Sequence, residues 1–470
     1  MKIEQIYTGC LAQGAYYIVS GKEAAIIDPL REVQPYLDRL EKDGVTLKYI
    51  FETHFHADFV SGHLDLSRKT GAPIIFGPNA EAEFETIIAE DGEIFNIGDI
   101  LIKALHTPGH TLESTTYLLL DEKGSEHAIF SGDTLFLGDV GRPDLAQKSA
   151  NMTQEELAGM LYDSLQSKIL PLPDEITVYP AHGAGSACGK NMQKETVDTL
   201  GNQRRTNYAL LQPDRESFIE AVLDGLPAPP KYFGMNVAMN KGGYESFEEV
   251  MNNGMKPIAP QDFESVVEQT GALILDTRSA ADFHQGFVPN SVNIGLKGDF
   301  APWVGAMIVD VKQAIALVCE PGTEEEAITR LSRVGFDKVI GYLEGGFEKW
   351  KAEGLETDSV NRITPEEFAG RFSKDAKVID VRKEAEFAAE HIEDAYNAPL
   401  DGIAGWAGSL AEEEGHFFLH CAGGYRSMIA ASILNSRGIR NFTEIAGGFN
   451  GIKKTSIPTS NYICQSKTLK

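Results

Sequence analysis

The chain has 470 residues, of which 42% are hydrophobic, and a chain of this length can bury more than one core, so we expect two to four domains. Its 42 basic and 69 acidic residues give a net charge of −27, which repels phosphate backbones and anionic lipid, so neither nucleic acid nor a membrane is expected as a partner. No apolar run is long enough to span a membrane, and the first residues do not resemble a signal peptide. The five cysteines are odd in number and far apart, as free thiols are in a reducing cytoplasm. We expect a cytoplasmic homo-oligomer.

The first half of the chain has an α/β pattern. Over residues 1–225, short apolar runs such as residues 24–27 and 73–76 alternate with helical stretches such as residues 153–169. The Pro-rich residues 226–230 then interrupt regular structure. With the Gly- and Asn-rich stretch that follows, they predict a linker over residues 226–256 that lies over the surface of the first domain.

Side chains that bind metals recur where successive apolar runs of this first domain end in loops. These side chains are His54, His56, Asp58, His110, Asp133 and His182. In an extended segment residues i, i+2 and i+4 face the same way, so the first three can converge on one point. Strand ends are rigid enough to hold ligands in place, and no fold-stabilising role requires this spacing. The pattern predicts a metal site, although spacing alone does not choose between His54 and His56.

The second half contains a duplicated unit, predicted over residues 257–357 and 360–470. Each copy has an Asp-x-Arg motif after an apolar strand, then a cysteine, then Gly-Gly-Phe, at nearly the same spacing. The landmarks are Asp276, Arg278, Cys319 and Phe347 in the first copy, and Asp380, Arg382, Cys421 and Phe449 in the second. Repeats of about one hundred residues indicate domain duplication, because solenoid units are much shorter. Both copies read as α/β domains.

The two cysteines of the repeat differ in their surroundings. Cys421 ends an apolar run and opens the loop Cys-Ala-Gly-Gly-Tyr-Arg-Ser, which precedes a helical stretch. Backbone N–H groups, the helix N-terminus and Arg426 would all favour the thiolate, so we interpret Cys421 as a nucleophile rather than a small buried residue. In the first copy, glutamates stand where Arg426 and Ser427 stand in the second, which disfavours a thiolate. We interpret Cys319 as structural.

These motifs resemble two known families joined in one chain. The pattern of His and Asp residues resembles the metallo-β-lactamase fold, which implies an αββα sandwich with its metal at one edge of two sheets. Within that superfamily, the sequences around His54, His110 and Arg142 most resemble those of persulfide dioxygenases, whereas the repeat resembles rhodanese sulfurtransferases. The order of dioxygenase, degenerate rhodanese unit and active rhodanese unit is similar to that of bacterial fused persulfide dioxygenase-sulfurtransferases. The fold class implied is α/β and multi-domain, a sandwich followed by two rhodanese-like domains.

The resemblance implies one Fe(II) per chain with the ligands His54, His110 and Asp133, and with His56 adjacent. The two-metal members of the superfamily have His directly after the Asp of the first motif, where this chain has Phe59. A second metal would therefore lack a nitrogen ligand, which leaves Asp58 and His182 as remnants of its site. Two His and one Asp with open positions match the facial triad of non-haem iron oxygenases, and zinc is the alternative.

The implied reaction is oxidation of a low-molecular-weight thiol persulfide by O2 to sulfite and the thiol. Arg142 is a candidate for binding an anionic group of the substrate, and the alternative for it is a surface salt bridge. Cys421 would accept a sulfane sulfur and pass it to sulfite, which gives thiosulfate and indicates sulfide detoxification. Cys188, a few residues after His182, is a candidate sulfur relay near the metal, and the alternative for it is a buried structural thiol.

Two other functions remain open from the sequence. A two-zinc thioester hydrolase of the glyoxalase II type would contain two metal ions and act without oxygen, although Phe59 argues against it. A non-catalytic sulfur carrier would hold a persulfide on Cys421 and consume no oxygen. Metal content and oxygen uptake distinguish the three functions.

Overall fold

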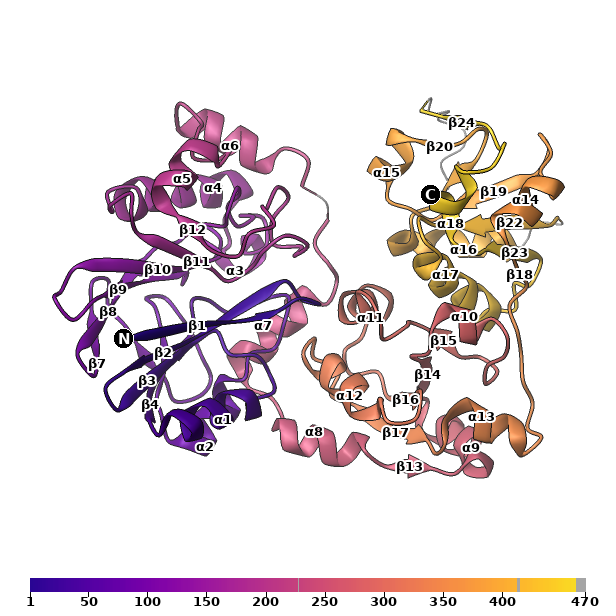
Figure 1. Cartoon of the computed structure of the whole chain (residues 1–470), viewed down its shortest axis with the longest axis horizontal. Helices are drawn as coiled ribbons and strands as arrows, with labels where there is room; N and C mark the ends of the chain where they lie inside the picture. Colours follow the sequence, from indigo (N-terminus) through magenta and orange to yellow (C-terminus); the bar gives the residue numbers. More distant parts are fainter. Residues whose placement is uncertain (227, 412–414, 462–470) are drawn as a thin grey trace. The chain divides into compact units, whose positions relative to one another are not determined.

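The computed structural model describes residues 1–226, 228–411 and 415–461, and the chain divides into two compact units (Figure 1). Unit 1 comprises Met1–Glu249 with Leu331–Gly335, and unit 2 comprises Val250–Arg330 with the chain from Phe336 onward. The end of the last predicted domain, including Cys464, lies outside the described residues. The other four cysteines are free thiols, as expected.

Unit 1 contains two mixed six-stranded sheets. The first sheet consists, in spatial order, of β1 (Lys2–Thr8), β2 (Gln13–Ser20), β3 (Glu23–Ile27), β4 (Thr46–Phe51), β5 (Ile74–Phe76) and β6 (Ile87–Ile88). The second sheet consists of β12 (Asp198–Thr199), β11 (Thr177–Pro180), β10 (Glu126–Gly132), β9 (Thr115–Leu120), β8 (Ile100–His106) and β7 (Ile94–Ile97). In the first sheet, β3 to β6 run parallel to one another and β1 and β2 are antiparallel.

Apolar residues on both faces of the strands produce the layers of unit 1. In β2, Tyr16 and Ile18 belong to the core between the two sheets, whereas Ala15 and Tyr17 belong to the core between the first sheet and its helices. This alternation follows from the period of two along a strand. Phe130 of the second sheet completes the inter-sheet core. The αββα sandwich expected from the sequence is confirmed.

Helices cover the outer faces of both sheets. The helices on the first sheet are α1 (Gln34–Asp43) and α2 (His63–Thr70). The helices on the second sheet are α4 (Gln154–Ser164), α5 (Leu200–Thr206) and α6 (Arg215–Leu223), and the short α3 (Gln147–Ala150) precedes them. A capping box of Thr153 and Glu156 begins α4, which continues as a π-helical turn over Leu165–Ile169. Together these segments match the helical stretch predicted over residues 153–169.

The stretch predicted as a linker contains two helices, α7 (Phe233–Gly242) and α8 (Phe247–Gly254). Helix α7 belongs to unit 1, and its Asn236 and Asn240 are buried. A helix that buries polar side chains lacks the apolar periodicity by which a sequence predicts helices. The composition of this stretch therefore concealed regular structure.

Unit 2 contains two parallel five-stranded sheets of the same topology. The first sheet consists of β13 (Pro257–Ile258), β17 (Val339–Leu343), β16 (Ile315–Val318), β14 (Leu273–Asp276) and β15 (Val292–Asn293). The second consists of β18 (Arg362–Ile363), β23 (Phe442–Ile445), β22 (Phe417–His420), β19 (Lys377–Asp380) and β21 (Tyr396–Asn397). A separate pair is formed by β20 (His391–Ile392) and β24 (Thr459–Ser460).

The helices of unit 2 also repeat. The first copy has α9 (Pro260–Thr270), α10 (Ala280–Phe283), α11 (Phe300–Met307), α12 (Glu324–Ser332) and α13 (Gly346–Ala352). The second copy has α14 (Pro365–Arg371), α15 (Glu384–Ala389), α16 (Ile403–Ala411) after a 3-10 turn over Leu400–Gly402, α17 (Tyr425–Ser436) and α18 (Gly448–Ile452). In each copy the Asp-x-Arg motif forms an internal ion pair of 2.6 Å, between Asp276 and Arg278 and between Asp380 and Arg382. The repeat found in the sequence is thus a repeat of side-chain geometry.

Helix α17 of the second copy is buried on all sides. Every side chain from Ser427 to Asn435 is buried, because the helix packs on its own sheet and also on β15 of the first copy. The backbone N–H of Asn293 in β15 donates to Ser432 Oγ at 2.9 Å. Within unit 2 the two copies therefore share a core.

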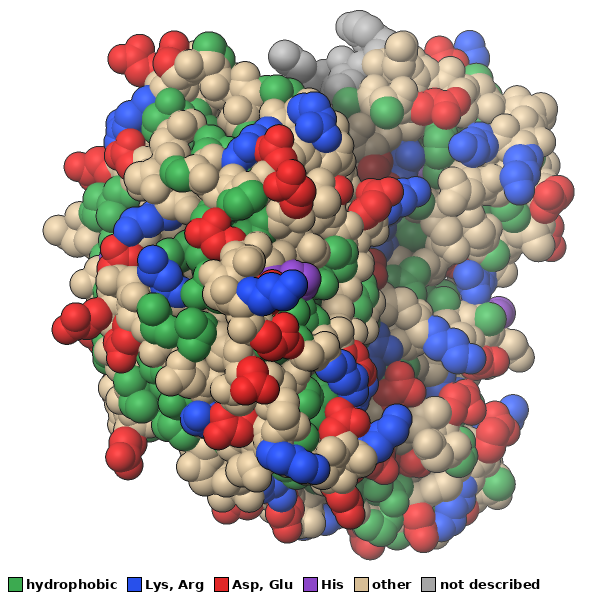
Figure 2. All heavy atoms as spheres, turned by 60° about the vertical axis from the view of Figure 1, so that its left-hand side comes forward, with side chains coloured by type: hydrophobic (Ala, Val, Ile, Leu, Met, Phe, Trp, Pro, Cys, Tyr) green, Lys and Arg blue, Asp and Glu red, His purple; other side chains and the backbone are tan. Residues whose placement is uncertain are grey.

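Over the face drawn in Figure 2, acidic and basic side chains are interspersed. Among the residues that the structure describes, no helix has both the length and the apolar character needed to cross a bilayer.

Candidate metal and sulfur sites

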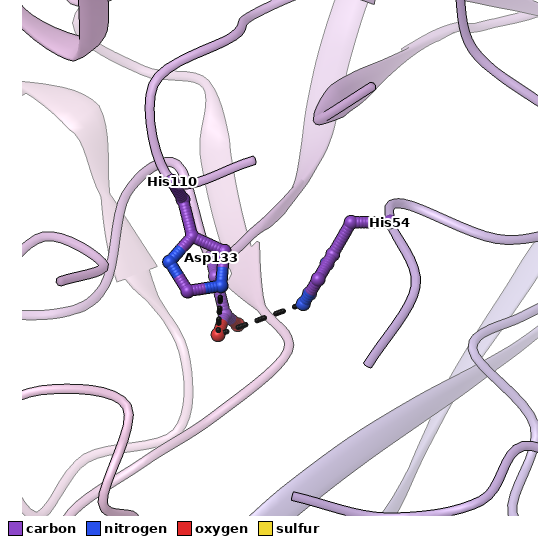
Figure 3. Close-up of side chains that lie close together, drawn as sticks. All are labelled: His54, His110 and Asp133. Carbon is purple, nitrogen blue, oxygen red and sulfur yellow. Dashed lines mark ion pairs between the residues drawn. The ribbon is translucent and has the colours of Figure 1, made fainter. Parts of the chain in front are cut away.

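Three side chains from loops of both sheets converge in unit 1. His54 follows β4, His110 follows β8 and Asp133 follows β10, and all three are buried (Figure 3). Their ligand atoms lie within 4.8 Å of one another. Asp133 Oδ2 is 3.4 Å from His110 Nε2 and 3.8 Å from His54 Nε2. The three residues that the resemblance implies as ligands therefore meet at one point.

Neighbouring groups place the proton of each imidazole on Nδ1. His110 Nδ1 is 2.9 Å from the carbonyl oxygen of Arg142, which can only accept a hydrogen bond. Thr53 Oγ1 donates its one hydrogen to Asp28 at 2.9 Å, so at its 3.0 Å contact with His54 Nδ1 it must accept. Both Nε2 atoms therefore direct a lone pair towards Asp133, which is the form that binds a metal ion.

The charge states of His54 and Asp133 also suit a cation. Burial lowers the pKa of His54 well below its ordinary value, and His56 lowers it further, so the ring is neutral. Burial raises the pKa of Asp133, but His182 and His54 lower it more, so the carboxylate is ionised. Asp133 Oδ2 is buried without a hydrogen-bond partner among the described residues. A divalent metal ion would satisfy that oxygen and both lone pairs, so this donor set fits a metal.

A second group of candidate ligands, formed by His56, Asp58 and His182, lies beside the first. His182 Nδ1 is hydrogen-bonded to Asp133 Oδ1 at 2.7 Å, and its Nε2 forms an ion pair with Asp58 at 2.8 Å. Burial lowers the pKa of His182, but Asp133 and Asp58 together raise it well above its ordinary value. A protonated His182 therefore balances both carboxylates, whereas both ring nitrogens of His56 and Oδ1 of Asp58 are buried without a hydrogen-bond partner among the described residues.

Phe59 fills the position after Asp58. Its ring is fully buried and packs against the ring of His56, with centroids 4.3 Å apart. His56 Nε2 lies 3.1 Å from Asp28 and 3.6 Å from Glu52. His56 thus belongs to the second group and to this acidic pair, and the three-residue site contains His54, the choice that spacing alone left open.

Sequence analysis missed two residues that hold the loop of these ligands. Asp28 lies at the end of β3, and its carboxylate accepts hydrogen bonds from the loop. Asn240 of α7 donates to the carbonyls of His56 and Phe59, and its own oxygen accepts from the N–H of Ser61. A lone Asp after an apolar run and an Asn within a helix carry no motif. The positive φ of 49° at Asp28 marks an unusual backbone that is visible only in the structure.

Arg142 and Cys188 are both buried in unit 1. The guanidinium of Arg142 donates to both oxygens of Asp144 at 2.7 and 2.8 Å and to the carbonyl of Ala187. Arg142 thus forms a salt bridge, which was the alternative to substrate binding, but the pair is not at the surface, because Arg142 is only 2% exposed. Cys188 lies with Asp133 among the candidate ligand groups, and burial, followed by Asp58 and Asp133, raises the pKa of its thiol well above the ordinary value.

Cys421 follows β22 in unit 2 and opens the loop that leads into α17. Its Sγ accepts a hydrogen bond from the backbone N–H of Gly424 at 3.1 Å, and Ser427 Oγ lies 3.4 Å away. Gly424 has a φ of 98°, a conformation that side chains rarely adopt, and this turn directs its N–H at the sulfur. The N–H of Gly424 stabilises negative charge on the sulfur, as the sequence analysis expected of the backbone N–H groups of this loop.

Arg426 contributes less charge than the sequence indicated. Both of its terminal nitrogens donate to the carboxylate of Glu386, at 2.6 and 2.8 Å. This hydrogen bonding is the main cause that raises the pKa of Arg426, with the charge of Cys421 among the smaller causes. Glu386 therefore compensates much of the Arg426 charge, while Arg426 still interacts favourably with negative charge on Cys421.

Cys319 is a buried thiol in the first copy. Burial is the main cause that raises its pKa to about 12, and Glu324, Asp276 and Glu320 add to the effect. The glutamates act in the direction that the sequence indicated, but they contribute less than burial. Cys319 is protonated near neutral pH, which is consistent with a structural role.

Comparisons with known proteins agree with this architecture. Residues 8–182 match the model of the metallo-beta-lactamase superfamily, and residues 259–353 and 364–455 match that of the rhodanese-like domain. A probable hydroxyacylglutathione hydrolase of Schizosaccharomyces pombe is 31% identical over 186 residues, which are 38% of this chain and 68% of that protein. A beta-lactamase hydrolase-like protein of Xylella fastidiosa is 30% identical over 44% of this chain, and the match spans about half (52%) of that protein's length.

A solved structure extends the similarity beyond the first domain. The crystal structure of a metallo-beta-lactamase from Staphylococcus aureus is 32% identical, with a TM-score of 0.65, and the match covers 73% of this chain and 98% of that one. Its coverage exceeds the segment that the superfamily model matches. The chain thus belongs to the metallo-beta-lactamase superfamily, and its metal-binding first domain is followed by two rhodanese-like domains.

Proposed function

We propose that the protein is a persulfide dioxygenase joined to a sulfurtransferase. It oxidises a low-molecular-weight thiol persulfide with O2 to sulfite and the free thiol, and Cys421 delivers sulfane sulfur to sulfite to form thiosulfate. One observation carries the proposal: the ligand atoms of His54, His110 and Asp133 lie within 4.8 Å of one another, and Asp133 Oδ2 has no hydrogen-bond partner among the described residues. The same chain contains a rhodanese-like domain with donors aimed at Cys421.

Two His and one Asp form the donor set of non-haem iron oxygenases, so we propose Fe(II), held by His54, His110 and Asp133. Bound Fe(II) would supply the redox chemistry by which O2 reacts with the persulfide sulfur. The protein fixes the orientation of this donor set: Thr53 and the carbonyl of Arg142 hold the two rings. Burial of all three side chains keeps bulk water from the reaction.

At the second centre, Cys421 attacks the sulfane sulfur of a donor persulfide. A bond forms between Sγ and that sulfur, and the bond to the donor breaks, which releases the donor as a thiolate. Sulfite then attacks the outer sulfur of the Cys421 persulfide, so thiosulfate leaves and the cysteine thiolate is restored. The N–H of Gly424 lies where it stabilises the negative sulfur in both steps.

Oxygen consumption tests this function. Protein loaded anaerobically with Fe(II) is given a thiol persulfide, and oxygen uptake and sulfite are measured together. We expect one sulfite for each O2 consumed, and we expect His110→Ala to abolish both while His127→Ala, on the exposed part of β10, changes neither. Absence of uptake with glutathione, bacillithiol and coenzyme A persulfides would contradict the proposal.

A two-metal thioester hydrolase is the second candidate. The relative from Schizosaccharomyces pombe is named a probable hydroxyacylglutathione hydrolase, and His56, Asp58 and His182 do lie close enough to share an ion. That function predicts two metal ions per chain and hydrolysis of an acylglutathione without oxygen. Metal analysis of the purified chain separates the candidates, because the dioxygenase requires one ion.

A further inference from the structure

Ser427 lies between Cys421 and Glu444, and its hydroxyl faces both. Ser427 Oγ is 3.4 Å from Cys421 Sγ and 2.6 Å from Glu444 Oε1, and all three side chains are buried. A hydroxyl group has one hydrogen, so it cannot donate to the sulfur and to the carboxylate at the same time. In one of the two contacts Ser427 Oγ must therefore accept a hydrogen, either from the thiol of Cys421 or from a protonated Glu444.

We propose that Glu444 takes up the proton of Cys421 through Ser427 when the thiolate forms. The S–H bond breaks as a new O–H bond forms on Ser427, and the original Ser427 hydrogen passes to Glu444 Oε1. The electron pair of the S–H bond stays on the sulfur. No proton leaves the protein, and the buried negative charge moves from the carboxylate to the sulfur. This inference rests on the proposed role of Cys421 as the sulfur acceptor.

The surroundings of Glu444 make its neutral form accessible. Burial raises the pKa of Glu444, while Arg362, whose Nε is 2.7 Å from Oε2, and the Ser427 hydroxyl lower it. Arg362 therefore keeps the carboxylate in place without excluding its protonation. The charged and titratable groups on the cysteine side are Arg426 with Glu386, His420, and the pair of Asp380 with Arg382. Of these, His420 contacts the backbone carbonyl of Cys421 through Nδ1, at 3.1 Å, and burial lowers the pKa of its ring.

The first copy lacks both partners of this arrangement. The strand registers place Tyr342 opposite Leu317 in the first copy, where Glu444 lies opposite Leu419 in the second. Six residues after Cys319 the chain has Glu325 instead of a serine. The copy whose cysteine has a strongly raised pKa is thus the copy without a proton acceptor in this position.

The pH dependence of Cys421 alkylation tests the proposal. The full chain reacts with iodoacetamide between about pH 6 and pH 8, and mass spectrometry of the peptide containing Cys421 gives the rate. Internal transfer conserves the number of bound protons, so the wild-type rate should vary by less than about threefold over this range. In Glu444→Gln and Ser427→Ala the proton must leave for solvent, so the rate should rise about tenfold per pH unit.

Two further variants control for changes that are merely structural. Ser427→Thr keeps a hydroxyl and should retain the flat profile, and it keeps the test decisive if Glu444→Gln fails to fold. Ser432→Ala removes another buried hydroxyl from α17. Its alkylation rate should also be independent of pH. The proposal is overturned if the wild-type rate already rises tenfold per pH unit, or if Glu444→Gln and Ser427→Ala stay flat.

A separate measurement distinguishes failure of the relay from failure of the proposed function. Incubation with thiosulfate should add one sulfur atom to the Cys421 peptide. If wild-type Cys421 gains no sulfur, its proposed role as sulfur acceptor is wrong, whatever the pH profile of alkylation shows. If it gains sulfur while the profiles of all variants coincide, only the relay through Ser427 to Glu444 is wrong.

Discussion

Thr53 fixes the tautomer of His54, a predicted metal ligand, because it donates its own hydroxyl hydrogen to Asp28. Because its hydroxyl hydrogen is bonded to Asp28, its oxygen accepts from His54 Nδ1 and leaves Nε2 unprotonated. We predict that Thr53→Val lowers metal affinity by about 10- to 100-fold, the effect usual for loss of such a partner. Thr53→Ser keeps the hydroxyl and should bind as the wild type does. Competition with a chromophoric chelator measures both, and equal affinity in the valine variant would refute this role.

At this scale the sequence predicts ligands better than the groups that orient them. His54, His110 and Asp133 follow strands that are visible as apolar runs, and such strand ends are where ligands are expected. Asp28 and Glu444 contact their partners through hydrogen bonds between segments distant in the chain. No local pattern records such a contact. It exists only after the strands have paired.

Helix α7 shows how one element stabilises another. Asn240 satisfies two carbonyls and one N–H of the loop over residues 56–61, and it is 1% exposed. Asn240→Ala leaves these groups unpaired, and each costs about 1–3 kcal/mol when buried. We predict faster hydrogen exchange of residues 56–61, measured by mass spectrometry. Asn252→Ala, at an exposed position of α8, should leave exchange unchanged, and the same result for Asn240→Ala would exclude this role.

The first rhodanese-like copy supports the cysteine loop of the second. Tyr425, at the start of α17, donates to the carbonyl of Gly295 at 2.7 Å, and a Cβ at Gly298 would lie 3.1 Å from the Tyr425 ring. Because Tyr425 is next to Gly424, whose N–H contacts the sulfur, we predict that Gly298→Ala slows sulfur loading of Cys421 by about tenfold or more. Sulfite production should be unchanged. Gly322→Ala is the matched control, since φ is also positive there but no atom lies within 4 Å. Equal loading in both variants would contradict the prediction.

For the whole molecule, the proposed function predicts that two products depend on different domains. Cys421→Ser should keep sulfite production and lose thiosulfate production, because no sulfane sulfur is delivered to sulfite. Cys319→Ser, in the first copy, should keep both. Ion chromatography of one reaction measures the two anions, and thiosulfate formed at the wild-type rate by Cys421→Ser would refute the transfer step.

The architecture was largely predictable from the sequence, and its supporting packing was not. Alternating apolar runs predicted an α/β first domain, and the resemblance of its His and Asp motifs to a known family implied the sandwich. The spacing of Asp-x-Arg, cysteine and Gly-Gly-Phe predicted the duplication. Helix α7 was missed, because its buried asparagines are polar. The compensation of Arg426 by Glu386 was also missed, since the two residues are separated by 40 positions.

The burial of α17 on both sides limits how the chain can be divided. A fragment that begins near residue 360 would keep Cys421 but remove β15, and with it the N–H bonded to Ser432 and the carbonyl bonded to Tyr425. The uncovered face of α17 is apolar and would promote aggregation in such a fragment. Low transferase activity of the isolated last domain would then reflect insolubility rather than chemistry. The smallest fragment suited to kinetic work contains both copies.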